Sequence, residues 1–397
     1  HMKYKSLAVL LLSASTSLIC MAQTIAVVED FKTTPTTQQE KKFPQVNSEG
    51  RVRVSIFAPQ ALKVQLDIGA VKYDLVKDDK GVWTGESAPQ DEGFHYYQLN
   101  IDGASVPDPG SLYYYGASRW GSGIEIPAKD QDFYALKNVP HGQLRENEYF
   151  SKTSNSVRRV YIYTPPGYDN DNKKYPVLYL QHGMGENETG WGNQGRTGLI
   201  MDNLIAEGKS LPFIIVMENS SVNLGGAPRG PRPAGAPIAA PPANAPRTGG
   251  AGGSMAGMNF AGQFERILFD DLVPYIESNY RVIPDQAHRA MAGLSMGGMQ
   301  THSIVVANPD KFSYVGMFSS GTFSPTEIKD IESFKKTVKV VFMSFGGREG
   351  GSTRIGAAAE EWNKVGIKGV SYISLETAHE WQSWRRSLHE FAQFLFK

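Results

Sequence analysis

Two patterns of hydrophobic and polar residues divide the chain. Apolar and polar residues alternate in the stretches 52–56, 64–68 and 96–100, which predicts half-buried β-strands. No helical period of useful length occurs between residues 46 and 108. Short strands at close spacing are typical of a β-sandwich, so we assign residues 46–130 to a small all-β domain.

The pattern changes from about residue 140. Continuous apolar runs now alternate with longer helical segments, which favours a mostly parallel sheet covered by helices on both faces. We therefore predict an α/β-hydrolase domain over residues 131–397. The runs predicted to be its buried strands are 176–181, 213–217, 290–294, 314–318, 338–345 and 370–375.

The first residues resemble a targeting signal. Lys3 and Lys5 precede a mostly apolar run over residues 7–20, and small residues end at Ala22. This order predicts a signal peptide over residues 1–22 and a secreted or periplasmic protein. Lipid attachment at Cys20 is an alternative, although the small residue expected before it is absent. The apolar run is too short to predict a membrane span.

Two further segments lack the pattern of a packed domain. Residues 23–45 are mostly polar, and this composition predicts a tether before the β-sandwich domain. Residues 223–258 are almost entirely small, polar or proline, with seven prolines between Pro228 and Pro246. Such an insertion buries too little apolar surface to offset its ordering entropy. It is expected either to cap the active site or to be a passive surface loop.

Composition excludes several functional classes. Lys+Arg and Asp+Glu both number 40, so nothing indicates a nucleic-acid partner. Cys20 is the only cysteine, which excludes a thiol nucleophile from the mature chain. No metal-binding motif such as H-E-x-x-H occurs, so we expect no metal and no cofactor. The sequence does not indicate an oligomeric state.

Residues 293–297 match the motif G-x-S-x-G around Ser295. An apolar strand leads into the motif and a small-residue helix start leaves it, which is the setting of a nucleophile elbow. Glycines are needed because the turn is too tight for side chains near the nucleophile. We predict that Ser295 is the nucleophile of a serine hydrolase.

A nucleophilic serine needs a base, and His379 is our candidate. It follows the last predicted strand, and loops at strand C-termini form the site in this architecture. His302 lies on the helix just after the elbow and faces the wrong way. His389 lies inside the last amphipathic helix, where it is expected to be a surface or packing residue.

The acid that orients the base is expected after the preceding strand. Glu349 is the only acidic residue in the loop 346–351, and we select it. Asp330 lies before that strand and Glu376 lies just before the histidine loop, so both are weaker choices.

The oxyanion needs two backbone N–H donors. The first is expected from Met296, which follows the nucleophile. The second is expected from Gly183 or Met184, because a strand end there is followed by His-Gly-x-Gly, as in lipase-type loops. His182 is expected to shape this loop rather than to transfer protons.

These motifs resemble carbohydrate esterase family 1 and the esterase D group. The segments that carry the resemblance are 175–191, 199–219, 272–298 and 376–396. The H-E-W-x-x-W form of the last segment looks most like feruloyl esterases that act on plant cell-wall xylan. This resemblance implies a polysaccharide or feruloylated oligosaccharide substrate. We take Trp191, Trp381 and His182 as candidate substrate-binding residues.

The first domain resembles a family 48 carbohydrate-binding module in the segments 53–66, 81–89 and 94–109. This resemblance implies glycan binding through the aromatic faces of Trp83, Tyr96 or Tyr97. The alternative is that these aromatics build the small core or the interface with the esterase domain.

The sequence therefore predicts a secreted serine esterase, with feruloyl esterase activity on xylan as the leading interpretation. Acetylxylan esterase and siderophore esterase are the enzymatic alternatives. A glycan-binding protein with an inert esterase domain is the alternative from another class, and the complete set Ser295, Glu349 and His379 argues against it.

Overall fold

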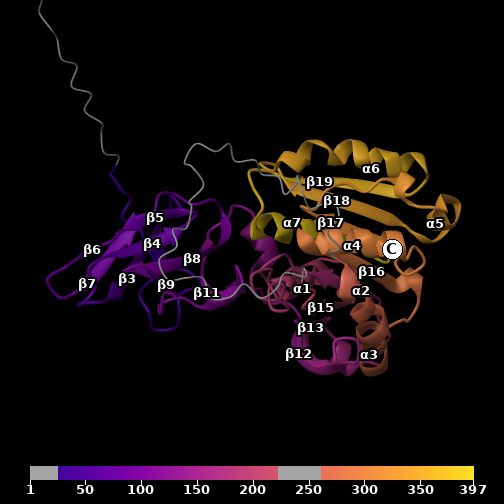
Figure 1. Ribbon diagram of the computed structural model, residues 1–397, viewed down its shortest axis with the longest axis horizontal. Coiled ribbons are helices and arrows are strands. Elements are labelled where there is room, and N and C mark those ends of the chain that lie inside the picture. Colours follow the sequence, from indigo (N-terminus) through magenta and orange to yellow (C-terminus); the bar gives the residue numbers. More distant parts are fainter. Residues whose placement is uncertain (1–25, 222–260) are drawn as a thin grey trace, which may run out of the picture.

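The computed structural model describes residues 26–221 and 261–397. These residues form a β-rich N-terminal part and a C-terminal α/β part that lie side by side (Figure 1). The predicted signal peptide, residues 1–22, and the insertion, residues 223–258, lie outside the described residues. Among the described residues, no helix is long and apolar enough to cross a membrane.

The N-terminal part consists of two antiparallel sheets, as the alternating pattern predicted. One sheet has the order β1 (Lys32–Thr33), β2 (Gln45–Val46), β3 (Val52–Phe57), β7 (Val82–Glu86) and β6 (Val76–Lys77). The other has the order β10 (Tyr113–Gly116), β11 (Arg119–Ile126), β8 (Gly93–Ile101), β4 (Val64–Ile68) and β5 (Val71–Asp74), with β9 (Ala104–Val106) paired to β8.

The sandwich buries the apolar side of each alternating strand. Val64, Leu66 and Ile68 are all buried, because every second side chain of a strand faces the same side. Trp83 and Tyr97 belong to the same core, with 7% and 2% of their surface exposed. Neither ring presents a face to a sugar, so the core interpretation holds for these two aromatics.

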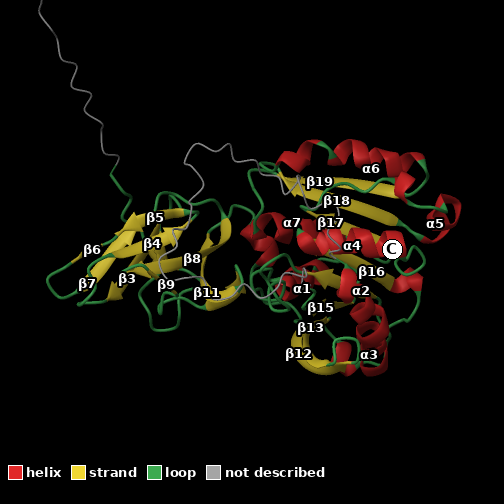
Figure 2. Cartoon of the chain, in the orientation of Figure 1, coloured by secondary structure: helices red, strands yellow, loops and turns green. Residues whose placement is uncertain are grey.

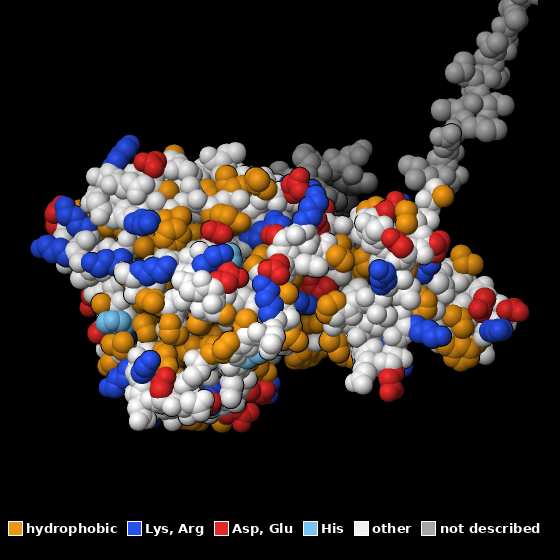
Figure 3. Space-filling view, turned by 180° about the vertical axis from the view of Figure 1, so that it is seen from behind, with side chains coloured by type: hydrophobic (Ala, Val, Ile, Leu, Met, Phe, Trp, Pro, Cys, Tyr) orange, Lys and Arg blue, Asp and Glu red, His pale blue; other side chains and the backbone are white. Residues whose placement is uncertain are grey.

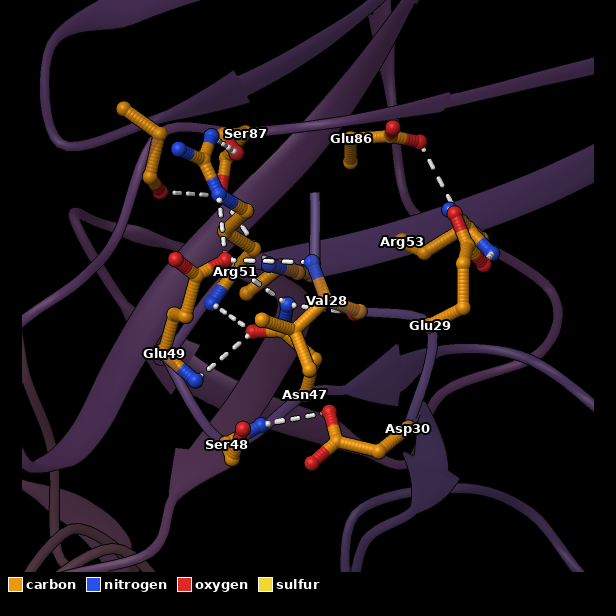
Figure 4. A network of polar contacts seen from close by, with 12 residues as sticks. Val28, Glu29, Asp30, Asn47, Ser48, Glu49, Arg51, Arg53, Glu86 and Ser87 are labelled. Atoms are coloured by element: carbon orange, nitrogen blue, oxygen red, sulfur yellow. Dashed lines mark hydrogen bonds and ion pairs between the residues drawn. The ribbon is translucent and has the colours of Figure 1, made fainter. Parts of the chain in front are cut away.

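The segment predicted to be a tether, residues 23–45, packs against the sandwich over its described part. Strand β1 pairs antiparallel with β2, and the Arg53 guanidinium donates to both carboxylate oxygens of Glu29, at 2.9 and 3.0 Å. The backbone N–H of Ser48 donates to Asp30 (Figure 4). The tether prediction is wrong here, because strand pairing and ion pairs hold these residues against the sandwich although many of their side chains are exposed.

The C-terminal part is built on one eight-stranded sheet. Its order is β12 (Gln143–Ser151), β13 (Ser156–Thr164), β15 (Ile214–Glu218), β14 (Val177–Gln181), β16 (Arg289–Leu294), β17 (Tyr314–Phe318), β18 (Val340–Gly346) and β19 (Lys368–Ser374). The pairs from β15 to β19 are parallel, whereas β12 and β13 are antiparallel. All six predicted strands are present.

Helices cover both faces of this sheet (Figure 2). Alternate residues of each buried strand face opposite sides, so Leu178 and Leu180 join one core while Val177 and Tyr179 join the other. The first core contains α1 (Thr197–Ala206) and α7 (Trp381–Ala392). The second contains α2 (Gly262–Ile267), α3 (Val273–Asn279), α4 (Met296–Ala307), α5 (Ile331–Thr337) and α6 (Ile355–Lys364).

Short helical turns complete the described connections. They are η1 (Gln131–Tyr134), η2 (Tyr168–Asn170), the π-helical turn η3 (Leu268–Leu272), η4 (Gln286–His288), η5 (Pro325–Glu327) and η6 (Gly350–Thr353).

The sandwich docks on the sheet face that carries α1 and α7. Phe94, Tyr96 and Tyr114 from strands β8 and β10 pack into the same apolar core as these two helices. The neighbouring Tyr97 points the other way, into the sandwich core. One strand, β8, therefore contributes to both cores. Lys, Arg, Asp and Glu side chains mix over the face seen in Figure 3, in keeping with the balanced composition.

Candidate active site

Strand β16 and helix α4 meet in a sharp turn at Ser295. The residue has φ 49° and ψ −117°, a conformation that costs strain for any residue with a side chain. The two flanking glycines are required by space. A Cβ on Gly293 would come within 2.3 Å of the Gly297 backbone, and one on Gly297 within 2.5 Å of the His182 carbonyl oxygen. The turn therefore has the geometry of a nucleophile elbow.

The structure brings Ser295, His379 and Glu349 together in one hydrogen-bonded chain. His379 Nε2 lies 3.0 Å from Ser295 Oγ, and His379 Nδ1 lies 2.7 Å from Glu349 Oε1. The three residues come from the turn after β16, the loop after β19 and the loop after β18. This is the spatial arrangement of a nucleophile, a base and an orienting acid.

Glu349 is held by more than the histidine. Its Oε2 accepts hydrogen bonds from the Ser319 hydroxyl and the Gly346 backbone N–H, both at 2.7 Å. Trp384 Nε1 in turn donates to the Ser319 oxygen at 3.0 Å. Burial alone would raise the pKa of the Glu349 carboxyl, but the hydrogen bonds from His379 and Ser319 outweigh it and lower that pKa. The carboxylate is therefore ionised and fixed in orientation.

The other candidates for base and acid have different partners. His302 pairs with Glu327 at 2.9 Å, and His389 stacks near Phe133. Asp330 accepts from the backbone N–H of Ser333 and so caps helix α5. None of these three side chains hydrogen-bonds to Ser295 or His379 among the described residues.

The predicted oxyanion donors flank the nucleophile. Met296 is the first residue of helix α4, so its N–H is free of helical bonding and lies at the positive end of the helix dipole. Gly183 lies against the nucleophile, since a Cβ on it would be 3.5 Å from Ser295 Cβ. Met184 follows it, half exposed at the cavity. The geometry keeps both Gly183 and Met184 as candidates for the second donor.

Two predicted substrate contacts are wrong because their side chains are buried. Trp191 has 1% of its surface exposed, and its Nε1 donates to the Gln181 carbonyl oxygen at 2.9 Å. The tryptophan fills the core beneath the site, at ring distances of 5.2 Å from Trp381 and 6.0 Å from Phe318.

His182 is the other predicted substrate contact that the structure contradicts. Its Nε2 accepts from the Ser220 backbone N–H at 3.0 Å, so Nδ1 carries the proton and donates to the Gly183 carbonyl oxygen at 2.7 Å. Burial lowers the pKa of His182 to about 4. The neutral ring ties the end of β14 to the end of β15, as expected for a residue that shapes the loop.

A cavity of about 440 Å³ opens beside Ser295 and His379. Both parts of the chain line it. Trp381 belongs to its wall, but only 1% of its surface is exposed and its Nε1 donates to the Tyr96 hydroxyl, so its role as a substrate contact stays a prediction. The sequence analysis missed Trp384, whose signal was the H-E-W-x-x-W motif, and the sandwich residues other than Tyr96, which it named as a candidate for glycan binding or for the interface between the domains. The sandwich residues that line the cavity are Gly69, Phe94, His95, Tyr96 and Ala117.

The described residues contain no group of three His, Cys, Asp or Glu side chains arranged to hold a metal ion.

The sequence profile of the family described as "Putative esterase" matches residues 151–394. This match covers more than half of the chain and includes the elbow, the acid loop and the histidine loop. The chain belongs to this esterase family.

Two curated relatives resemble this esterase. It is 43% identical over 378 residues to the endo-1,4-beta-xylanase/feruloyl esterase of Xylanibacter ruminicola, which covers 93% of this chain and 48% of that protein. It is 29% identical over 171 residues to endo-1,4-beta-xylanase Y of Acetivibrio thermocellus, covering 40% of this chain and 13% of that one. The chain thus spans about half of the first relative and a smaller share of the second.

Solved structures support the fold of this esterase. The enterobactin esterase of Shigella flexneri superposes with a TM-score of 0.58 at 14% identity, over 86% of this chain and 92% of that one. A ferulic acid esterase of Anaeromyces mucronatus in complex with ferulic acid superposes with a TM-score of 0.50 at 20% identity, over 68% and 96%. The first match spans both parts of the chain.

Proposed function

We propose that this esterase hydrolyses feruloyl esters on the side chains of xylan. The observation that carries the proposal is the hydrogen-bonded chain Ser295–His379–Glu349 at a cavity large enough for an aromatic acid. The relative from Xylanibacter ruminicola, which is 43% identical to this chain, is named for both xylanase and feruloyl esterase activity.

The reaction proceeds through an acyl-enzyme. His379 Nε2 takes the proton of Ser295 Oγ as that oxygen attacks the ester carbonyl, and Glu349 stabilises the imidazolium that forms. His379 then gives the proton to the sugar oxygen, which leaves as a hydroxyl. In the second half, His379 deprotonates a water molecule that attacks the acyl-enzyme, the bond to Ser295 Oγ breaks, His379 returns the proton to that oxygen, and the acid is released.

Charge on the tetrahedral intermediate is met by backbone donors. The N–H of Met296 points from the start of helix α4, and the N–H of Gly183 or Met184 supplies the second hydrogen bond. Such donors are fixed before the reaction, so they stabilise the oxyanion without reorganising.

The lining of the cavity favours an uncharged aromatic acyl group. It includes Phe94, Trp381 and Trp384, and among the described lining residues there is no lysine or arginine. Ferric siderophores built on catecholates are anionic and need cations, so this lining disfavours siderophore ester hydrolysis. An acetyl group would leave most of the volume unfilled, which disfavours acetylxylan as the preferred substrate.

The proposal extends to the N-terminal sandwich, which resembles a family 48 carbohydrate-binding module. Of the rings first considered for sugar contact, Trp83 and Tyr97 are buried in the sandwich core, and the Tyr96 hydroxyl is hydrogen-bonded to the esterase domain. Tyr113 and Trp120 on strands β10 and β11 are 45% and 50% exposed. We place the contact with the polysaccharide on these two rings, since exposed aromatic faces stack on sugars.

We also propose that the protein is exported, on the strength of the signal-like residues 1–22. Sequencing the N-terminus of the protein recovered outside the cytoplasm tests this proposal. A protein found only in the cytoplasm with residues 1–22 retained would contradict it.

One experiment separates the candidate substrates. The protein is incubated with feruloylated xylan and with acetylated xylan, and the released acids are quantified by chromatography. We expect ferulate as the main product and no release by Ser295→Ala, since removal of a nucleophile costs several orders of magnitude in turnover. Acetate as the main product would make acetylated xylan the preferred substrate instead. Activity in Ser295→Ala equal to that of the parent protein would refute the mechanism.

A further inference from the structure

One buried hydroxyl group links the sandwich to the esterase domain behind the oxyanion turn. The Oη atom of Tyr96, on strand β8, accepts hydrogen bonds from Trp381 Nε1 at 3.0 Å and from Gln194 Nε2 at 2.8 Å. The same hydroxyl donates to Glu186 Oε2 at 3.2 Å. A phenol has one donor and two acceptor positions, so this group is fully used by esterase residues.

Two of these partners lead directly to the reacting groups. Trp381 begins helix α7, two residues after His379. Glu186 ends the turn that begins at Gly183, and its backbone N–H donates to the Gly183 carbonyl oxygen at 3.2 Å. The Glu186 carboxyl also lies against the start of that turn, because a Cβ on Gly183 would lie 3.1 Å from Glu186 Oε1.

A second contact from the sandwich holds the same turn. The backbone N–H of Ser118 donates to the Gly185 carbonyl oxygen at 2.8 Å. Ser118 lies in the connection between β10 and β11, where Ala117 and Ser118 both have positive φ, at 51° and 61°. The turn that carries Gly183 and Met184 is therefore held from outside its own domain at Glu186 and at Gly185.

The buried carboxyl of Glu186 fits this supporting role. Burial raises its pKa to about 8, so at neutral pH the group is largely uncharged and places no negative charge behind the oxyanion. Burial also raises the pKa of the Tyr96 hydroxyl well above its ordinary value, which keeps it a donor.

We propose that Tyr96 is a positioning residue for catalysis, acting through Glu186 on the backbone donors of the turn Gly183–Glu186. The sandwich is then a working part of the catalytic unit and not only a module that binds substrate. This inference rests on the proposed esterase function. Oxyanion donors must lie within hydrogen-bond distance of the developing charge, so a shift of about 1 Å costs on the order of 100-fold in rate.

The test compares two matched variants on a small substrate, 4-nitrophenyl acetate, which does not reach beyond the site. Tyr96→Phe removes only the hydroxyl. Tyr114→Phe is the control, because Tyr114 packs beside the same Phe94 ring, at 4.8 Å, but its hydroxyl makes no hydrogen bond within the described part of the chain. Active-site titration with an organophosphate counts competent Ser295 residues, so kcat is expressed per folded site.

We expect Tyr96→Phe to lower kcat per site roughly 10- to 100-fold with KM nearly unchanged, and Tyr114→Phe to match the parent. A loss in Tyr96→Phe of less than about 3-fold would overturn the inference. Equal losses in both variants would overturn it too, since they would indicate a general packing effect. A change in KM alone would overturn it by making Tyr96 a substrate contact.

A double-mutant cycle tests the route through Glu186. If Tyr96 acts through that carboxyl, Tyr96→Phe adds little further loss in a Glu186→Gln background, whereas independent effects would multiply and contradict the route. Failure of the proposed function is recognised separately. In that case the parent protein itself has no activity that Ser295→Ala removes, whatever the behaviour of Tyr96→Phe.

Discussion

Arg385 of helix α7 and Glu125 of strand β11 form an ion pair across the interface between the two parts of the chain. The Arg385 side chain has no exposed surface, and both of its terminal nitrogens donate to the Glu125 carboxylate. Its Nε donates to the Gln194 carbonyl oxygen at 2.8 Å. Burial would raise the pKa of Glu125, but the Arg385 charge outweighs it and lowers that pKa. The pair therefore fixes how the sandwich sits on α7.

The first prediction concerns the stability of this interface. Glu125→Gln leaves a buried guanidinium without its counter-charge, so the free energy of unfolding should fall by about 3 kcal/mol. Asp91→Asn is the control, because it removes an exposed interface pair with Arg348 at 2.6 Å and should cost about 1 kcal/mol or less. Urea unfolding followed by tryptophan fluorescence measures both. Equal losses in the free energy of unfolding for the two variants would show that the buried pair stabilises the fold no more than the exposed pair.

The second prediction concerns the acid. Glu349→Gln keeps the size of the side chain but removes the charge that orients His379, so kcat should fall roughly 100- to 10,000-fold. Asp330→Asn is the matched control, since asparagine also caps helices and that residue lies at the start of α5. Steady-state kinetics on 4-nitrophenyl acetate compares them. A larger loss in Asp330→Asn would move the role to that residue.

The third prediction concerns pH and stability. Burial raises the pKa of Glu186 to about 8 and that of Glu218 to about 7, from an ordinary value of 4.5. Between the ordinary pKa and the raised pKa of each group, the folded protein holds a proton that the unfolded chain has released. The free energy of unfolding should therefore decrease as pH rises from about 5 to 8. Glu186→Gln removes one of the two groups and should make this decrease shallower.

Thermal unfolding from pH 5 to pH 8.5 measures the effect on Tm. The difference in Tm between Glu186→Gln and the parent isolates Glu186, because Glu218 titrates in both proteins. A constant difference across the range would contradict a raised pKa for Glu186.

The fourth prediction concerns polysaccharide contact by the sandwich. Trp120→Ala, made in a Ser295→Ala background to prevent hydrolysis, should weaken retention on insoluble xylan, because a stacking face is lost. Leu62→Ala is the control, since Leu62 is an apolar side chain of the same sandwich that is 89% exposed. Depletion assays measure the bound fraction. Equal retention of both variants on xylan would show that Trp120 does not contact the polysaccharide.

The candidate triad could be predicted because its signals are local. Ser295, Glu349 and His379 each follow a strand whose apolar run is visible in the sequence, and the chain order of acid and base is constant in this fold. The same runs predicted six of the eight strands of the large sheet. Strands β12 and β13 were missed, because β12 is mostly exposed and β13 is buried only in its second half, so neither forms a continuous apolar run.

The walls of the cavity could not be predicted, because they depend on contacts between distant segments. Tyr96 and Tyr97 are neighbours of the same type, yet one meets the esterase domain and the other fills the sandwich core. Alternation along a strand separates two faces but does not say which partner covers each face. Trp191 was placed in the substrate site, although a large indole beneath the site is stabilised most by full burial.

The packing of Phe94, Tyr96 and Tyr114 into the same core as helices α1 and α7 has a consequence for the ancestry of such enzymes. Many multidomain proteins consist of domains that can fold alone and are joined by linkers. A module whose aromatic side chains complete its neighbour's interior cannot be exchanged for another without leaving apolar surface uncovered. These two parts are therefore expected to be inherited, lost and transplanted together, as one cassette.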